Sequence, residues 1–141
     1  MKLDLSALDN AIVSLEESIE VISNEAWFRG QSKAVKNTLL AGAIQNFEFV
    51  YELSIKMIER RIELDAATPT EADLFDYRDL LRTAAERGLV ADVEAWFDYR
   101  KLRNITAHTY DREKAQQVYR GIPAFLSGAR LLLRALEHRN V

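Results

Sequence analysis

The residues best suited to chemistry gather in one short stretch, residues 103–110. His108 can accept and donate a proton near neutral pH, since imidazole titrates there. Arg103 is a permanent cation that can bind a phosphate through two parallel hydrogen bonds, and Asn104 can orient a water molecule or a phosphate oxygen. Together these side chains supply a proton shuttle and a fixed positive charge. They are the parts needed to cleave a phosphodiester bond without a metal ion.

Further cations flank this stretch. Arg100 and Lys101 precede it, and Arg112 and Lys114 follow it. The chain as a whole carries a net charge of −3, so it cannot attract RNA or DNA through bulk charge. We therefore expect this local basic patch, diluted by nearby acidic residues, to provide phosphate binding, with Arg100 and Lys101 in supporting positions.

Composition excludes several kinds of site. The chain has no cysteine, which rules out disulfides, thiolate metal sites and a cysteine nucleophile. Histidine occurs only as His108 and His138, so we expect no metal site and no cofactor. The N-terminus lacks the pattern of a signal peptide, and no apolar stretch is long enough to cross a membrane. We expect a cytoplasmic protein with no membrane contact.

Apolar residues recur every three or four positions along most of the chain, which indicates amphipathic helices. No strand-like alternation and no internal repeat is present. A chain of 141 residues with short connections predicts one all-α domain over residues 1–141, an antiparallel, up-and-down four-helix bundle with an extra short helix. The expected helices run over about 4–24, 32–64, 76–87, 92–109 and from 111 onward, with a loop at 66–70 and a kink near Gly121 caused by Pro123.

The expected helix over 32–64 carries two apolar stripes side by side, so it must be buried on two sides. The surplus apolar face predicts a two-fold, isologous homodimer. On the same helix, Glu52 and Lys56 have the spacing of an ion pair along one face. Alternatively, a buried Glu52 near the motif orients Arg103.

The spacing of Arg103 and His108 sets a condition on the site. Five residues correspond to about 140° around an ideal helix, so the two side chains do not share a face. They converge only if the helix ends before His108, or if a second subunit completes the site. The residues alone also fit a structural interpretation, in which Arg103 and His108 satisfy the last carbonyls of the helix and Tyr110 is an interface aromatic.

The segment from Arg103 to Tyr110 resembles the R-x4-H-x-Y motif of HEPN domains. Other segments resemble one branch of these domains, the nucleotidyltransferase substrate-binding-protein-like family. They are the pattern F-E-x-x-x-E-x-x-x-K at 47–56, the segment R-D-L-L-R-x-A-A-E-x-G-L at 78–89, and Trp96. The resemblance therefore covers nearly the whole chain.

This resemblance implies a helical homodimer and a partner, a separate minimal nucleotidyltransferase encoded beside it. In the toxin branch, the positions matching Arg103 and His108 support RNA cleavage, and the partner adenylylates the position matching Tyr110 to silence the toxin. Three functions remain open: a metal-independent ribonuclease toxin, a non-catalytic subunit that binds the substrate of the transferase, and a plain dimeric scaffold. We favour the first because Arg103, Asn104, His108 and Tyr110 are all present, which makes RNA or a nucleotide the expected ligand.

Overall fold

The computed structural model describes residues 2–66 and 76–140, and every regular element within them is helical. The all-α prediction is therefore confirmed. The elements are α1 (Ser6–Ser23), α2 (Glu25–Arg29), α3 (Lys33–Asp65), α4 (Tyr77–Glu86), α5 (Val93–Ile105), the 3₁₀ helix η2 (Thr106–His108) and α6 (Arg112–Arg139).

Short polar side chains begin the helices where the sequence predicts them. The side chains of Ser32, Asp76, Asp92 and Asp111 each accept a hydrogen bond from a backbone N–H in the first turn of α3, α4, α5 and α6. After α4 the chain turns at Gly88, whose φ of 77° is a left-handed conformation that favours glycine. These local signals place the helix boundaries.

Three features differ from the sequence-based expectation or fall outside it. Helix α2 was not predicted, because five residues are too few to show a periodic apolar pattern. Helix α6 runs through Pro123 without a break, and the kink expected near Gly121 stays a prediction. Of the loop expected at 66–70, only Ala66 lies within the described residues.

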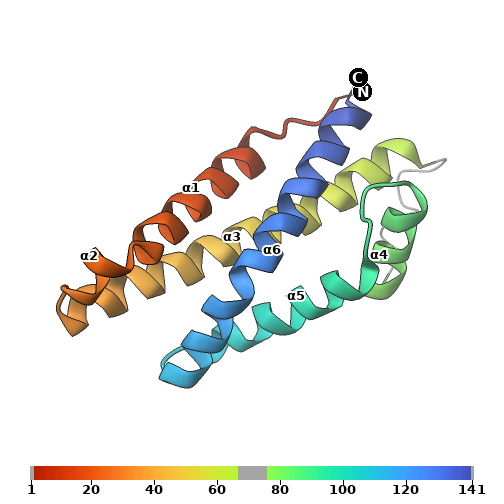
Figure 1. Ribbon diagram of the computed structural model, residues 1–141. Coiled ribbons are helices and arrows are strands. Elements are labelled where there is room, and N and C mark those ends of the chain that lie inside the picture. Colours follow the sequence, from red (N-terminus) through yellow and green to blue (C-terminus); the bar gives the residue numbers. More distant parts are fainter. Residues whose placement is uncertain (1, 67–75, 141) are drawn as a thin grey trace.

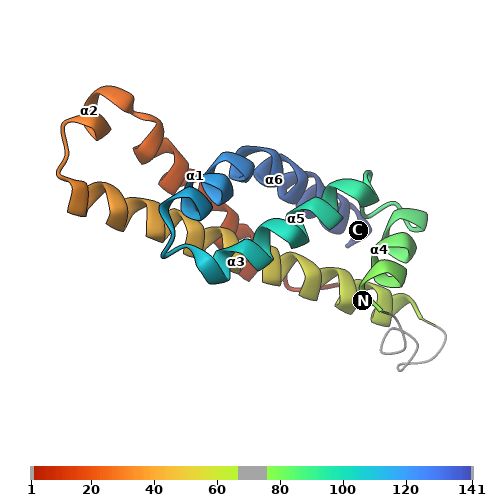
Figure 2. The same cartoon turned by 90° about the horizontal axis from the view of Figure 1, so that it is seen from below.

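The long helices lie against one another over much of their lengths (Figure 1). Helix α3 contacts α1, α4, α5 and α6, while α6 also contacts α1 and α5. Helices α2 and α4 lie at opposite ends of the molecule, and the two chain ends meet near the α4 end (Figures 1 and 2). Helix α3 is therefore the element against which the others are placed.

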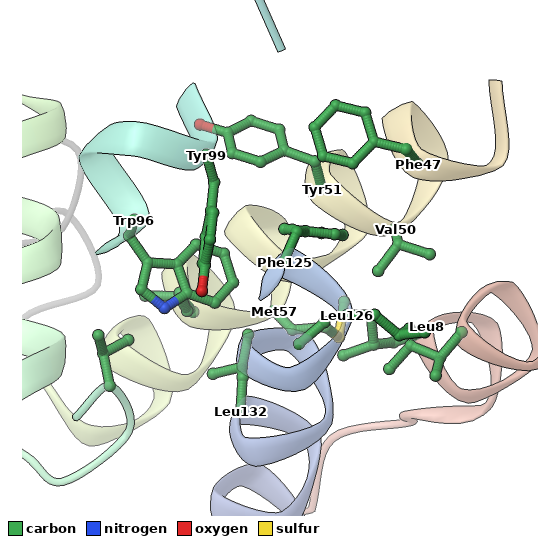
Figure 3. Packing of buried hydrophobic residues seen from close by; sticks show 14 of the residues in the cluster. Leu8, Phe47, Val50, Tyr51, Met57, Trp96, Tyr99, Phe125, Leu126 and Leu132 are labelled. Carbon is green, nitrogen blue, oxygen red and sulfur yellow. The ribbon is translucent and has the colours of Figure 1, made fainter. Parts of the chain in front are cut away.

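An aromatic cluster joins α3, α5 and α6 inside the core. The ring of Phe125 makes edge-to-face contacts with Phe47 and Tyr99, at centroid distances of 4.8 and 5.1 Å. Trp96 packs edge-to-face on Tyr99 at 5.1 Å, and Tyr51 lies 6.4 Å from Phe125. Figure 3 shows these rings gathered around Phe125. Such pairs stabilise a core beyond their buried area and fix the position of α5.

Two glycines of α6 allow α5 to approach closely. A Cβ atom at Gly128 would lie 2.5 Å from the Tyr99 hydroxyl oxygen, and one at Gly121 would lie 2.5 Å from a methyl of Leu102. The Tyr99 hydroxyl donates a hydrogen bond to the Ala124 carbonyl at 3.2 Å. This close packing holds α5 against α6 just before the C-terminal end of α5, where the motif begins at Arg103.

The two chain ends are held together by a polar clasp. The Asn140 side chain accepts a hydrogen bond from the Leu3 N–H at 3.0 Å and donates one to the Leu3 carbonyl at 2.9 Å. Arg61, buried at the end of α3, donates to the same Asn140 side chain and to Asp65, which Arg139 also contacts. Burial acts to raise the pKa of Asp65, but the hydrogen bonds from Arg139 and Arg61 outweigh burial and hold that pKa below its ordinary value.

Candidate active site

The C-terminal end of α5 changes from an α-helix to a 3₁₀ helix just before His108. Helix α5 ends at Ile105, and η2 carries the chain over Thr106–His108. The backbone N–H of Thr106 donates to the carbonyl of Arg103, only three residues back, which tightens this last turn. The structure therefore meets the condition that the α-helix end before His108.

The Arg103 guanidinium is bound on several sides. Its Nε and Nη2 both donate to the Glu52 Oε1, at 3.2 and 2.7 Å. Its Nη1 donates to the Thr106 hydroxyl at 3.0 Å and lies 3.5 Å from a carboxylate oxygen of Glu48. These hydrogen bonds to Glu52, aided by the charges of both glutamates, raise the pKa of Arg103 above its ordinary value despite partial burial.

The group formed by Arg103, Glu48 and Glu52 carries a net negative charge. One guanidinium faces two carboxylates, and its side chain is about 30% exposed. Three of the five N–H groups of Arg103 are used in the hydrogen bonds to Glu52 and Thr106, so two remain for another acceptor. Arg103 is an anchored cation with spare donors, and any anion that binds it has to compete with Glu48.

Glu52 does not pair with Lys56 along α3, so that expectation is wrong. Its carboxylate reaches across to Arg103 instead, as the alternative prediction had it, although the Glu52 side chain is 57% exposed and not buried. Glu48 joins the same guanidinium because it lies one turn before Glu52 on the same face of α3. The planar guanidinium of Arg103 can donate two hydrogen bonds to the Glu52 carboxylate, which the ammonium group of Lys56 cannot match in geometry.

Thr106 is one of the residues that the sequence analysis did not identify. It is buried, and its hydroxyl accepts from the Arg103 guanidinium while donating to the Arg103 carbonyl. The hydroxyl therefore ties the side chain of Arg103 to its own backbone. Its position inside the motif, between Arg103 and His108, was the available signal.

His108 and Tyr110 lie together on the surface. The His108 Nδ1 is 3.4 Å from the Tyr110 hydroxyl oxygen, and the two rings meet nearly edge-to-face. Tyr110 is 85% exposed, and His108 is exposed as well. Both the imidazole and the phenol are therefore accessible from solvent.

The other predicted site residues have different surroundings. Asn104 is exposed, and its side chain has no partner among the described residues. Arg100 places its guanidinium 4.3 Å from the centre of the Tyr77 ring, and Lys101 lies 3.9 Å from Asp98. The structure thus brings Glu52 to Arg103 and does not bring Arg100 or Lys101 to it.

Residues 2–66 and 76–140 hold no group of three or more His, Asp or Glu side chains placed to bind a metal ion. In that same part of the chain, no helix is long and apolar enough to cross a membrane.

Residues 3–138 match the family model described as nucleotidyltransferase substrate binding protein like. The chain belongs to this family. The resemblance drawn from the motif and its companion segments is therefore confirmed, and it extends over nearly the whole sequence.

Two known proteins are similar to this chain over nearly their full lengths. A relative from Haemophilus influenzae named probable ribonuclease HepT is 48% identical over 139 residues, which are 99% of this chain and 95% of the relative. The solved structure of HI0074 from Haemophilus influenzae has a TM-score of 0.92 and 46% identity, and the match covers 95% of this chain and 99% of that one. That structure is described as the fold of a substrate-binding domain of a nucleotidyltransferase.

A hydrogen-bonded pair of tyrosines, the buried Tyr51 and the half-buried Tyr77, was also missed from sequence. The Tyr51 hydroxyl donates to the Tyr77 hydroxyl at 2.7 Å, and Tyr77 donates to the Trp96 carbonyl at 3.2 Å. Burial raises the pKa of both tyrosines, so both phenols are neutral at pH 7. The pair joins α3, α4 and α5 next to Arg100, which packs on the Tyr77 ring.

Proposed function

We propose that this chain is a metal-independent endoribonuclease, partnered by a separate minimal nucleotidyltransferase that silences it by adenylylating Tyr110. The observation that carries the proposal is the end of α5, where an anchored guanidinium with spare donors precedes an exposed imidazole. The name of the 48% identical relative, probable ribonuclease HepT, supports the same activity.

The reaction needs only groups that RNA and this chain supply. His108 takes the proton from the ribose 2′-hydroxyl, whose oxygen then attacks the adjacent phosphorus. The new O2′–P bond forms as the P–O5′ bond breaks, leaving a 2′,3′-cyclic phosphate. A protonated imidazole gives the departing O5′ its proton, and in a homodimer the second copy of His108 serves as this acid.

Arg103 stabilises the charge that builds on the phosphate. Its two spare N–H groups bind the phosphate oxygens, while Glu52 and Thr106 hold the guanidinium in place. Glu48 is the partner that gives way, because its 3.5 Å contact is the longest one to Arg103. Asn104, exposed beside Arg103, orients the attacking hydroxyl or a phosphate oxygen.

The proposed assembly is a two-fold homodimer of an up-and-down bundle made by α1, α3, α5 and α6. Helix α3 supports it, because Phe49 in its middle is 49% exposed and lies only three residues before Glu52. A second copy covering Phe49 would bring two motif ends near each other. Sedimentation should give twice 16.2 kDa, and a concentration-independent monomer would overturn both the dimer and the shared site.

Cleavage of a labelled single-stranded RNA by the purified chain tests the activity. We expect cleavage to persist in EDTA and to leave cyclic phosphate ends. The His108→Ala variant should lose about 10²–10⁴-fold in rate with unchanged helical circular dichroism. His138→Ala, which removes the other histidine, is the control and should cleave normally. Loss of activity in EDTA together with an active His108→Ala variant would rule the mechanism out.

A second function, a non-catalytic subunit that binds the substrate of the transferase, is favoured by one observation. The Arg103 position carries two carboxylates against one cation, a poor surface for a polyanion. This alternative predicts no RNA cleavage by the wild-type chain and a transferase that acts on its substrate only when this chain is added.

A further inference from the structure

A pocket of about 280 Å³ opens beside Tyr110, where α3 meets the start of α6. Its walls include Asn37, Leu40 and Ile44 from α3, and Arg112 and Gln116 from α6, with Tyr110 at one side. The volume lies at the lower end of the range for small-molecule sites. A single nucleotide base fits such a pocket, whereas a dinucleotide cofactor does not.

The walls combine apolar surface with unused polar groups. Leu40 and Ile44 give an apolar floor. Within residues 2–66 and 76–140, the side chains of Asn37, Gln116 and Arg112 make no hydrogen bond or ion pair. Each amide offers one acceptor and two donors, and Arg112 offers up to five donors. The pocket is therefore supplied with hydrogen-bonding capacity that the fold itself does not use.

This combination matches a purine nucleotide. A flat base can lie on apolar side chains while its edge pairs with an amide, and Asn and Gln side chains pair best with adenine, which offers a donor and an acceptor side by side. The free guanidinium of Arg112 suits the attached phosphate. We propose that the pocket of Asn37, Gln116 and Arg112 is an adenine-nucleotide subsite next to the His108–Tyr110 pair.

The adenine can come from two sources, and both rest on the proposed function. The first is a base of single-stranded RNA beside the cleaved phosphate, since Tyr110 borders the pocket and lies 3.4 Å from His108. The second is the adenylyl group on Tyr110 itself, folded back into the pocket. Binding of free AMP does not depend on either source and tests the pocket alone.

Filling the pocket is the sharpest test. Ala41 lines it and is exposed on α3, so Ala41→Leu should occlude the pocket without disturbing the core. Ala34→Leu, at an exposed α3 position that does not line the pocket, is the matched control. Gln116→Ala is paired in the same way with Gln117→Ala on α6.

The binding arm titrates the full-length chain with AMP or CMP and follows amide chemical shifts. We expect AMP to bind the wild type at least fivefold more tightly than CMP. Ala41→Leu and Gln116→Ala should each weaken AMP binding about tenfold, and the two controls should change it less than twofold. Absence of AMP binding at millimolar concentration, or equal binding by Ala41→Leu, would overturn the subsite.

The source arm maps RNA cut positions and compares the Tyr110-adenylylated form. An RNA source predicts adenine next to the cut, a preference lost in Ala41→Leu but kept in Ala34→Leu. An adenylyl source predicts unchanged cut positions and shifted signals of pocket residues on modification. If Ala41→Leu alters neither readout, the pocket does not serve this site and the inference is wrong. If the wild type cleaves no RNA, the proposed activity fails while the AMP titration still decides the pocket.

Discussion

The Arg103 guanidinium holds one oxygen of Glu52 through two nitrogens, at 2.7 and 3.2 Å. This contact joins α5 to α3. It also sets the direction of the Arg103 side chain, which contacts the carboxylates of both Glu48 and Glu52. We infer that Glu52 positions Arg103, whereas Glu48, at 3.5 Å, would oppose the binding of a phosphate in the proposed reaction.

Replacing each glutamate separates these two effects. We expect Glu52→Gln to lower kcat of RNA cleavage about tenfold or more, because a less rigid Arg103 is misplaced in the transition state. Glu48→Gln should instead lower KM, because it removes a negative charge that competes with phosphate. Equal effects of the two substitutions on kcat and KM would contradict the assignment.

The close approach of α5 and α6 is open to a direct stability test. Gly128→Ala places a methyl against the Tyr99 ring and should destabilise the fold by about 1–3 kcal/mol. Gly42→Ala in α3 is the control, because a Cβ atom there meets nothing within 4 Å. That substitution should stabilise by about 0.5–1 kcal/mol through helix propensity. Urea unfolding of both variants measures the difference, and equal stabilities would refute the tight contact.

The chain-end clasp predicts a loss of stability in acid. The pKa of Asp65 is lower in the folded chain than in the unfolded one, so the stabilisation from its ion pairs is complete above the unfolded pKa of about 4. It is lost as pH falls through the lower folded pKa. The free energy of unfolding of Asp65→Asn should therefore be lower at pH 7 and should fall less steeply below pH 4. A pH profile parallel to that of the wild type would exclude this role.

Tyr110 is the expected acceptor for the partner enzyme. Its phenol is 85% exposed, and an added nucleotide would bring a bulky anion beside His108 and occupy the phosphate site. Incubation with the neighbouring nucleotidyltransferase and ATP should add the mass of AMP to the peptide holding Tyr110 and stop RNA cleavage. Tyr110→Phe should resist labelling and silencing, whereas Tyr119→Phe on α6 should behave as wild type. Equal labelling of Tyr110→Phe would remove the regulatory part of the proposal.

Local signals explain why the helices were predictable. Ser32, Asp92 and Asp111 carry their own capping information, and the apolar spacing that follows each of them specifies a helix. The five residues of α2 carry no such spacing, so they escaped prediction. The resemblance of the motif and its companion segments to a known family identified the family correctly.

The arrangement around Arg103 was harder to predict, because it depends on contacts between helices that lie far apart in the sequence. Sequence spacing favours a Glu52–Lys56 pair within α3, and only the packing of α5 on α3 shows that Glu52 turns to a residue 51 positions away. The pairing of Tyr51 with Tyr77 is of the same kind. Nothing in the order of residues distinguishes these tyrosines from ordinary core aromatics.

The hydrogen bonds between Asn140 and Leu3 also determine how the molecule would respond to a mechanical force. A pull applied between the two chain ends acts first on this small group of bonds, before tension reaches any long helix. Once these bonds break, the two chain ends would separate. Helices α1 and α6 would then detach from α3 progressively, starting at the chain ends. The η2 end, which carries His108, lies away from the chain ends and would be among the last parts to open (Figure 1).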